Sequence, residues 1–185
     1  MPIQVASRRR SAASLAKAHP GAEIIDVTSK ASEPWVRMSP FFPHGGIPVP
    51  QTPGVYSQTV EGIWQALKVF ETADVDAAKL DITNMTGLKR TVRKHGPVRG
   101  HRDGLYGSRL LTYQTARRRI YLPAYRWVLE NRVSSLVKRL RRLADSCDVV
   151  LLDYTTNGDV DDPATPLSHA ALVCLYIEGR WPEKA

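Results

Sequence analysis

The sequence has no apolar run as long as the roughly 18 residues that a membrane-spanning helix needs. Residues 11–19, which follow three consecutive arginines, are too short and too polar for the core of a signal peptide. We therefore expect a soluble, cytoplasmic protein that has no membrane partner. The arginine-rich segment predicts a solvated start to the fold, and we expect roughly residues 1–20 to be flexible.

Cysteine is scarce, with Cys147 and Cys174 as the only two. Cys147 opens an apolar run and Cys174 lies inside one, so both are predicted to be buried thiols rather than a disulfide. None of the five histidines stands at a zinc-ligand spacing from a cysteine or from another histidine. The sequence therefore predicts no metal site built on these residue types.

Several nucleotide and hydrolase motifs are also missing. The chain has no serine nucleophile elbow, no phosphate-binding glycine loop of the P-loop type and no dinucleotide fingerprint. No redox cofactor is implied, and we predict that the protein uses no cofactor. There is no internal repeat and no linker, and a length of 185 residues suits one domain, so residues 1–185 are predicted to form a single domain.

Basic residues are abundant, and they are concentrated in one part of the chain. The formal net charge is +8, and residues 89–142 contain 16 basic against 2 acidic residues. From residue 145 onward the balance reverses, with 8 acidic residues against 2 basic ones. Most of the basic residues are arginines, whose planar guanidinium suits bidentate contact with phosphate. A basic face that serves only solubility or internal ion pairs is the alternative.

Apolar patterning predicts a mainly helical α+β fold. Residues 22–28 and 149–152 are rich in β-branched or apolar side chains and are predicted as strands of one small sheet. Residues 57–70 have apolar side chains at helical spacing, with Ser57 or Thr59 as the cap, and residues 121–143 continue a similar stripe.

Two further segments complete this expected fold. The six prolines of residues 34–53 exclude a helix, and the apolar side chains among them indicate an ordered loop packed onto the body. A last helix is expected after Thr165 as N-cap and Pro166 as first residue, with Gly179 as its stop.

Two polar segments are candidates for chemistry. Residues 153–162 contain several aspartates and Asn157, which suits general acid–base work, stabilisation of an oxocarbenium ion, or a divalent metal bound by oxygen ligands. An Asn-Gly turn with solvated acids remains an alternative. Residues 94–102 form a basic, glycine-containing segment that could wrap phosphate or serve as an exposed connection.

The order of these features resembles the NADAR family of N-glycosidases. The resemblance rests on Ser-Pro-Phe-Phe at 39–42, Gly-Ile-Pro-Val at 46–49, the helix block 59–70 and the acidic block 155–162. The helix block matches best, because its glutamate, Gln-Ala pair and Lys-x-Phe stand at the family's spacing. Near the C-terminus the family's Trp-Gly-Asp-like element is replaced by Val160-Asp161-Asp162.

This resemblance implies hydrolysis of a base–ribose bond in a nucleotide-like small molecule or in ADP-ribosylated nucleic acid. Glu61 would contact the ribose or activate water. Asn157 and one of Asp159, Asp161 or Asp162 would orient the sugar or protonate the departing base, with Asp159 and Asp162 as the catalytic candidates. The substrate-binding candidates are Phe42, His44, Trp64, Gln65, Lys68, Arg99, Arg119 and Asn157.

Two other functions remain open on the sequence. The chain could be a non-catalytic nucleic-acid-binding or virion-associated protein that uses only its arginine-rich face, in which case phosphate contacts would supply most of the affinity. It could also bind ADP-ribose or a related nucleotide without catalysis. For Glu61, a simple pairing with Lys68 or Gln65 on an exposed face is the alternative to a catalytic role.

Overall fold

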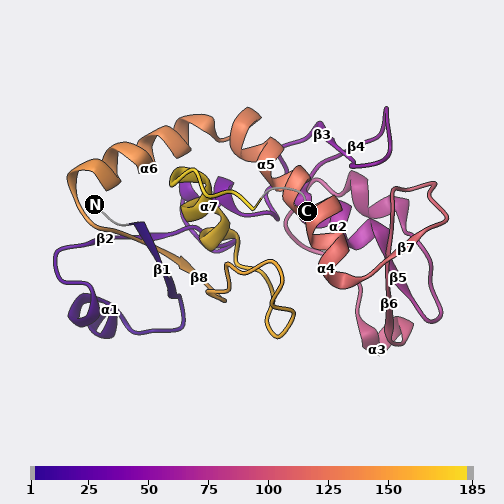
Figure 1. Cartoon of the computed structure of the whole chain (residues 1–185), viewed down its shortest axis with the longest axis horizontal. Helices are drawn as coiled ribbons and strands as arrows, with labels where there is room; N and C mark the ends of the chain where they lie inside the picture. Colours follow the sequence, from indigo (N-terminus) through magenta and orange to yellow (C-terminus); the bar gives the residue numbers. More distant parts are fainter. Residues whose placement is uncertain (1–2, 183–185) are drawn as a thin grey trace. The chain divides into compact units, whose positions relative to one another are not determined.

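The computed structural model describes residues 3–182 and divides into two compact units, each of which is described by itself (Figure 1). Unit 1 combines the chain up to Ser39 with Val133–Pro182, and unit 2 is the intervening Pro40–Arg132. Helices take up 38% of the residues and strands 16%, which confirms the mainly helical α+β class. A single domain over residues 1–185 stays a prediction.

Unit 1 is built on a parallel sheet of three strands. The order is β1 (Ile3–Ser7), β8 (Val149–Asp153) and β2 (Glu23–Asp26), with β8 in the centre. Every residue of β8 is buried, as expected for a central parallel strand covered on both faces. The predicted pairing of the segments around residues 22–28 and 148–153 in one sheet is confirmed.

The prediction of a flexible start at residues 1–20 is wrong for the described residues from Ile3 onward. β1 pairs along its whole length with β8, and helix α1 (Ala12–Ala18) follows with Ser11 as its N-cap. The partner strand lies more than 140 residues away in sequence, so no local pattern reveals it. The arginines at 8–10 are exposed, as predicted.

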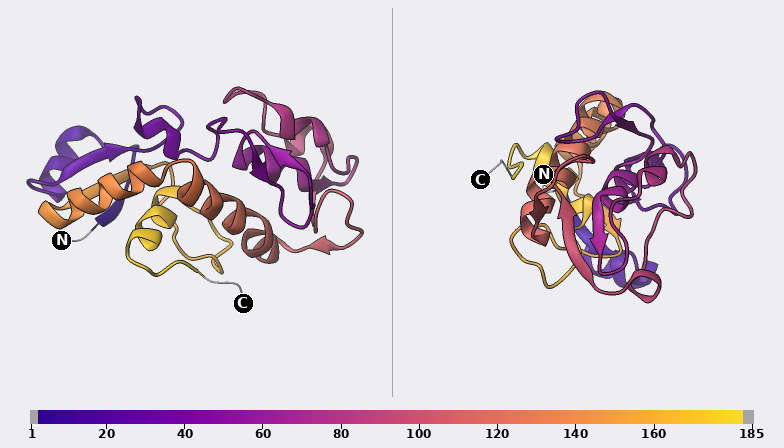
Figure 2. Two further views of the ribbon diagram at one scale, coloured as in Figure 1. Left: turned by 90° about the horizontal axis from the view of Figure 1, so that it is seen from above. Right: turned by 90° about the vertical axis from the view of Figure 1, so that its right-hand side faces the viewer.

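Helices cover both faces of this sheet. Leu15 of α1 packs with Ala6, Val150 and Leu152, while α6 (Ser134–Ser146) and α7 (His169–Ile177) also contact β8. Since side chains alternate along a strand, Val149 and Leu151 face the side opposite to α1. The left view of Figure 2 shows α6 running alongside the sheet. Residues 35–38 add the short 3-10 helix η1 (Trp35–Met38).

Unit 2 contains the amphipathic helix α2 and two antiparallel sheets. The larger sheet has the order β5 (Lys68–Phe70), β6 (Val98–Arg102) and β7 (Leu110–Leu111), and the smaller pairs β3 (Ile47–Pro48) with β4 (Tyr56–Ser57). Its helices are α2 (Val60–Leu67), η2 (Ala77–Asp81), α3 (Val92–His95), α4 (Tyr113–Ala116), the π-helical turn η3 (Arg117–Tyr121) and α5 (Leu122–Asn131).

Of the two helices expected from apolar spacing, one is shorter than predicted and the other is broken in two. The helix predicted over 57–70 begins after Thr59 and ends at Leu67, because the chain continues as strand β5 and pairs with β6. The helix predicted over 121–143 is two helices, α5 and α6, separated at Arg132 and Val133. In both places the apolar spacing runs on through the change of structure and conceals it.

Three other segments can be compared with their predictions. The packing of segment 34–53 onto the body is confirmed, since Met38, Ile47 and Val49 are buried, but the exclusion of any helix is wrong for the single 3-10 turn η1. The basic segment 94–102 is no open loop, because it forms the end of α3 and the whole of β6. The last helix is capped by Ser168 instead of Thr165, since the Ser168 hydroxyl also finds a buried partner in Asp153.

Thr59 is a fully buried N-cap whose removal has a measurable cost. Its Oγ1 accepts a hydrogen bond from the backbone N–H of Gly62 at 2.7 Å. Replacement by alanine leaves that N–H without its acceptor, so we expect Thr59→Ala to lower the free energy of unfolding by about 1–2 kcal/mol. Thr59→Ser keeps the acceptor and serves as the control in a denaturant titration. Equal losses in both variants would show that the methyl group matters rather than the cap.

Candidate functional site

Glu61 lies in the first turn of α2 with its side chain buried. The residue is only 8% exposed, and its Oε1 accepts a hydrogen bond from Gln65 Nε2 at 2.8 Å. The other end of the Gln65 amide accepts from the backbone N–H of Arg90 at 3.0 Å, which fixes the orientation of the amide. Gln65 therefore holds the carboxyl of Glu61 in one position. Glu61 therefore does pair with Gln65, as the alternative from the sequence had it, but the face on which they pair is buried and not exposed.

The environment of Glu61 favours its neutral form. Burial raises the pKa of Glu61 above its usual range, and the hydrogen bond from Gln65 and the positive charges of Lys68 and Lys89 only partly oppose this. Lys68 is half-buried, and burial lowers its pKa in spite of the attraction of Glu61. A carboxyl group whose pKa is raised exchanges protons closer to neutral pH, which suits general acid–base chemistry.

Aromatic rings surround Trp64 on the same helix. Its ring centroid lies 3.8 Å from that of His101, and the rings of Tyr113 and Tyr121 approach edge-on at 5.8 Å each. His101 is 1% exposed, and neither ring nitrogen has a hydrogen-bond partner among residues 3–182. Burial, assisted by the Lys68 charge, lowers the pKa of His101 to about 3, so the imidazole is neutral.

His101 was not predicted as a site residue. In the sequence, His101 lies inside a basic segment and gives no sign of burial. Its place in strand β6 turns the ring inward, against Trp64 of α2. The buried glycine before it, Gly100, would bring an added Cβ within 2.4 Å of the Leu111 carbonyl oxygen. This close approach of β6 and β7 explains why position 100 is a glycine, since any larger residue would collide with the β7 backbone.

Two predicted substrate-binding residues, Phe42 and His44, form a half-buried ring pair before α2. Their ring centroids are 4.8 Å apart. The segment that carries them is tied to α2, because the backbone N–H of Glu61 donates to the Pro40 carbonyl at 2.9 Å. Glu61, Trp64, Gln65, Lys68, Phe42 and His44 all belong to unit 2.

Arg99 and Arg119 also lie in unit 2, where both are ion-paired. Arg99 contacts Glu71 at 2.9 Å, and Arg119 contacts both carboxylate oxygens of Asp103 at 3.0 Å. A phosphate bound by either arginine would have to share it with a carboxylate. Their substrate-binding role stays a prediction, and for these two residues the structure provides the internal ion pairs that the sequence left as an alternative.

In unit 1, Asn157 shapes the loop that follows β8. Its Nδ2 donates to the carbonyl oxygens of Asp162 and Thr165 at 3.1 and 3.0 Å, and its Oδ1 accepts from the Asp159 N–H at 2.8 Å. The carboxylates of Asp159 and Asp162 accept from backbone N–H groups two residues further on. These contacts give the acidic segment a defined loop conformation.

This loop lines a polar groove of about 520 Å³. The groove lies at the carboxyl ends of β1 and β8, where parallel sheets commonly bind ligands. It brings Asn157 and Asp162 together, two of the predicted site residues, whereas Asp159 is not among the lining residues. The lining residues are Ser7, Arg9, Tyr154, Thr155, Thr156, Asn157, Asp162 and Thr165.

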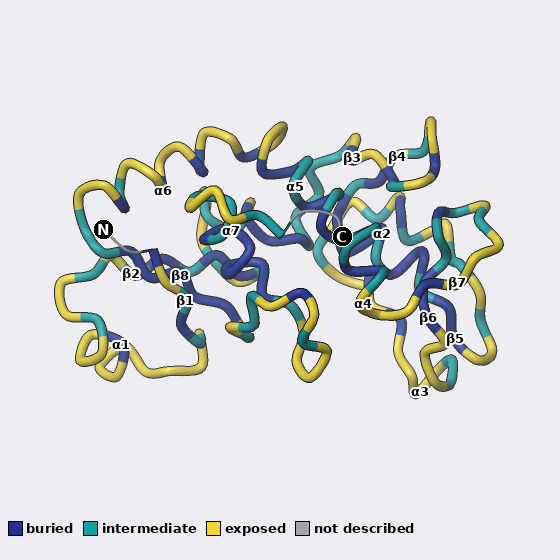
Figure 3. Tube along the Cα trace, viewed as in Figure 1, coloured by how far each residue is buried: buried dark blue, intermediate teal, exposed yellow. Residues whose placement is uncertain are grey.

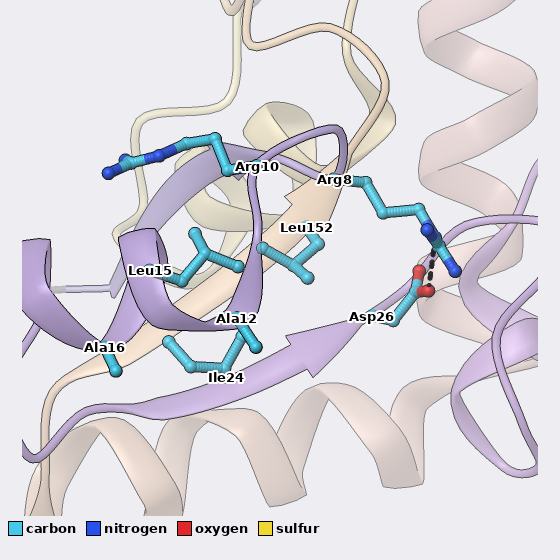
Figure 4. A pocket seen from close by; sticks show the side chains of 8 residues that line it. All are labelled: Arg8, Arg10, Ala12, Leu15, Ala16, Ile24, Asp26 and Leu152. Atoms are coloured by element: carbon cyan, nitrogen blue, oxygen red, sulfur yellow. Dashed lines mark hydrogen bonds and ion pairs between the residues drawn. The ribbon is translucent and has the colours of Figure 1, made fainter.

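A second hollow of about 300 Å³ opens between α1 and the sheet (Figure 4). Its lining is mainly apolar, with Ala12, Leu15 and Ala16 from α1 and Ile24 and Leu152 from the sheet. Arg8 closes one end through an ion pair with Asp26 at 2.8 Å. None of the predicted site residues lies in this hollow.

In a comparison with known protein families, a family model matches residues 7–173, which include most of unit 1 and the Pro40–Arg132 segment of unit 2. The chain belongs to DUF6939, a family of unknown function. A comparison with curated proteins finds no match. The assignment to DUF6939 carries no activity with it, so the chemistry of the chain has to be inferred from its own residues.

This DUF6939 chain also holds a buried ion pair in unit 1. His169 Nδ1 lies 2.9 Å from Asp153 Oδ2, and His169 Nε2 lies 2.9 Å from the carbonyl oxygen of Val27. A carboxylate and a carbonyl both accept hydrogen bonds, so both ring nitrogens must donate and the imidazole is protonated. Asp153 further accepts from the Ser168 hydroxyl at 2.8 Å and from the Tyr154 N–H at 2.7 Å.

Among residues 3–182, no group of three or more histidine, cysteine, aspartate or glutamate side chains is arranged to hold a metal ion.

Within the same part of the chain, no helix is long and apolar enough to cross a membrane. Both cysteines are free thiols; Cys174 is buried as predicted, but the prediction of a buried thiol is wrong for Cys147, which is half-buried.

Proposed function

We propose that the protein is an N-glycosidase-like hydrolase that cleaves the bond between a base and ribose in a nucleotide-like or ADP-ribosylated substrate. The observation that carries the proposal is the buried, clamped carboxyl of Glu61, whose pKa is raised by burial. An exposed Glu61 paired only with Lys68 would have favoured a simple binding protein. The resemblance of residues 59–70 to the NADAR helix block supports the same assignment.

The chemistry requires a base that is rigid and partly desolvated. Water attacks C1′ of the ribose, the C1′–N bond breaks, and the base departs with the bonding electron pair while the water proton passes to Glu61. Positive charge develops on the ribose in the transition state, and an ionised carboxylate in a low-dielectric site stabilises it. A positioned general base contributes a further factor of ~10²–10⁴ in rate.

We also propose roles for three other predicted site residues, Trp64, Lys68 and Asp162. Trp64 and Lys68, on the same helix and its continuation, would contact the base and an anionic group of the substrate. In unit 1, the hydroxyl-rich groove suits a sugar, and Asp162 is its carboxylate. A role for Asp162 in orienting a sugar is a separate proposal, made for the unit 1 groove by itself. It predicts that Asp162→Asn weakens binding of ribose-containing ligands to that groove without destabilising the fold.

The test is release of free base, measured by chromatography, from ADP-ribosylated guanine DNA and from nucleotide-like small molecules. Wild type is compared with Glu61→Gln, which keeps the oxygen that accepts from Gln65 but cannot take up the water proton. Release by wild type that depends on Glu61 supports the proposal. No release from any substrate, with nucleic-acid binding unchanged by the substitution, would overturn it and favour the non-catalytic binder.

A further inference from the structure

The arginine-rich part of the chain is divided between cations that are already neutralised and cations that are not. In unit 2, ion pairs join Arg99, Arg102, Arg119 and Arg126 to Glu71, Asp74, Asp103 and Glu130 respectively. On α6 in unit 1, the side chains of Lys138 and Arg142 make no hydrogen bond or ion pair with any residue from 3 to 182. Arg93, Lys94 and Arg109 of unit 2 are also exposed and make no side-chain ion pair among the described residues, but α6 carries four exposed basic residues on one short helix, at 138, 139, 141 and 142.

The packing of α6 turns its cations to solvent. Leu136, Val137, Leu140 and Ala144 form the buried side of the helix, so the basic residues between them face outward. Figure 3 shows this alternation of buried and exposed segments along the helix. The exposed basic residues are Lys138, Arg139, Arg141 and Arg142, and one acid, Asp145, shares their side of the helix.

Two of these arginines are held in place by aromatic rings. The guanidinium of Arg139 lies 5.0 Å from the centroid of Trp35, and that of Arg141 lies 5.6 Å from the centroid of Tyr176. A guanidinium over a ring is ordered but keeps the N–H donors along its edge, which can then bind phosphate with a smaller entropic cost. Lys138 and Arg142 lie one helical turn apart beside them, a separation of about 6 Å.

We propose that the exposed side of α6 binds the phosphate backbone of nucleic acid, so that the substrate base is part of a polymer rather than of a free nucleotide. Arginine in excess over lysine, with guanidinium groups ordered for bidentate contact, suits a regular row of phosphates. A membrane surface is a less suitable partner for α6. A helix that binds a membrane inserts apolar side chains into the lipid, and the apolar side chains of α6 are buried within unit 1.

The binding test uses a labelled DNA duplex of about 20 base pairs, roughly two helical turns, followed by fluorescence anisotropy at several salt concentrations. Wild type is compared with Lys138→Gln/Arg142→Gln. We expect the dissociation constant to rise roughly tenfold, and the slope of log K against log salt to shrink by about 1.8, since each lost phosphate contact removes ~0.9. Lys17→Gln/Lys30→Gln removes the same charge from exposed positions of unit 1 and should change neither quantity.

The inference has two parts: binding of DNA by α6, and release of a base from the bound DNA. Only the second part rests on the proposed function, because DNA binding is measured without turnover. If the protein is active, the α6 double variant should release base from a small-molecule substrate as fast as wild type, but release less from DNA. Equal weakening by both double variants would reduce the effect to net charge and overturn the inference. Wild-type binding to phosphatidylserine vesicles, without binding to DNA, would overturn it in favour of a membrane surface.

Discussion

Asp153→Ala is expected to lower the free energy of unfolding by about 3–5 kcal/mol, because it leaves a buried imidazolium without its counter-charge. The carboxylate of Asp153 is 5% exposed and His169 is 7% exposed, so water cannot replace the lost partner without opening the fold. The substitution also removes the acceptor for the Ser168 hydroxyl, which caps α7. Denaturant titration of the two proteins at neutral pH measures the difference.

Comparison with Asp153→Asn separates the charge from the shape. Asparagine retains an oxygen for the Ser168 hydroxyl and the Tyr154 N–H but loses the negative charge. We expect it to be destabilised as well, though less than the alanine variant. If Asp153→Ala and wild type unfold at the same denaturant concentration, the pair makes no net contribution and the protonated state of His169 is wrong.

The same pair predicts how stability depends on pH. Burial alone would lower the pKa of His169, but the charge of Asp153 and the hydrogen bonds to Asp153 and Val27 raise it above its ordinary value of 6.5. The stabilisation is therefore fully present below pH 6.5 and lost as the pH rises through the raised pKa. For Asp153, burial raises the pKa, but His169 and the hydrogen bonds lower it overall, so its contribution is lost only in strong acid.

A matched variant isolates this alkaline loss. His169→Gln cannot titrate, so its free energy of unfolding should lack the decrease that wild type shows as the pH rises above about 6.5. Unfolding curves between neutral and alkaline pH give the comparison directly. Parallel pH profiles for the two proteins would contradict the assignment of the decrease to His169.

Two of the three strands of the unit 1 sheet were predictable, because the central strand β8 and the edge strand β2 both carry apolar runs. Thr59 was one of the two caps that the sequence offered, and the structure selects it over Ser57. β1 was not predictable, because a short strand near the N-terminus is specified by its partner β8 rather than by its own pattern. For the same reason β5 was missed, since Phe70 continues the helical spacing of α2 while the backbone pairs with β6.

Glu61 and Gln65 were named as site residues from the sequence, but their environment was not predictable and His101 was missed. The helical spacing of Glu61 and Gln65 suits an exposed flank as well as a buried contact. What buries them is packing from segments distant in sequence, including Arg90, whose N–H fixes the Gln65 amide. The pairing of Asp153 with His169 was hidden in the same way, because the acidic segment contains several aspartates and only the fold selects one.

Glu61→Gln is expected to raise the stability of the protein while it abolishes most of its activity. The pKa of Glu61 is raised mainly by burial, so the folded protein holds the ionised carboxylate less well than the unfolded chain does. Stability is thus lost as the pH rises through that raised pKa, and at neutral pH the neutral glutamine avoids the cost. We expect the free energy of unfolding to rise by about 0.5–2 kcal/mol, which is the usual size of a single stabilising substitution.

Activity should change in the opposite direction, by about 10²-fold or more in kcat/KM. Because the Glu61 carboxyl must be ionised to act as general base, wild-type turnover should fall in acid, with a midpoint pH above the ordinary glutamate range. The melting temperature of wild type should change over the same pH range, because it depends on the same carboxyl group. Glu130→Gln removes an exposed carboxylate that pairs with Arg126 on α5, and it should leave both quantities nearly unchanged. If Glu61→Gln is less stable than wild type, the folded protein must stabilise the ionised carboxylate of Glu61. If the variant keeps full turnover, a residue other than Glu61 must be the general base.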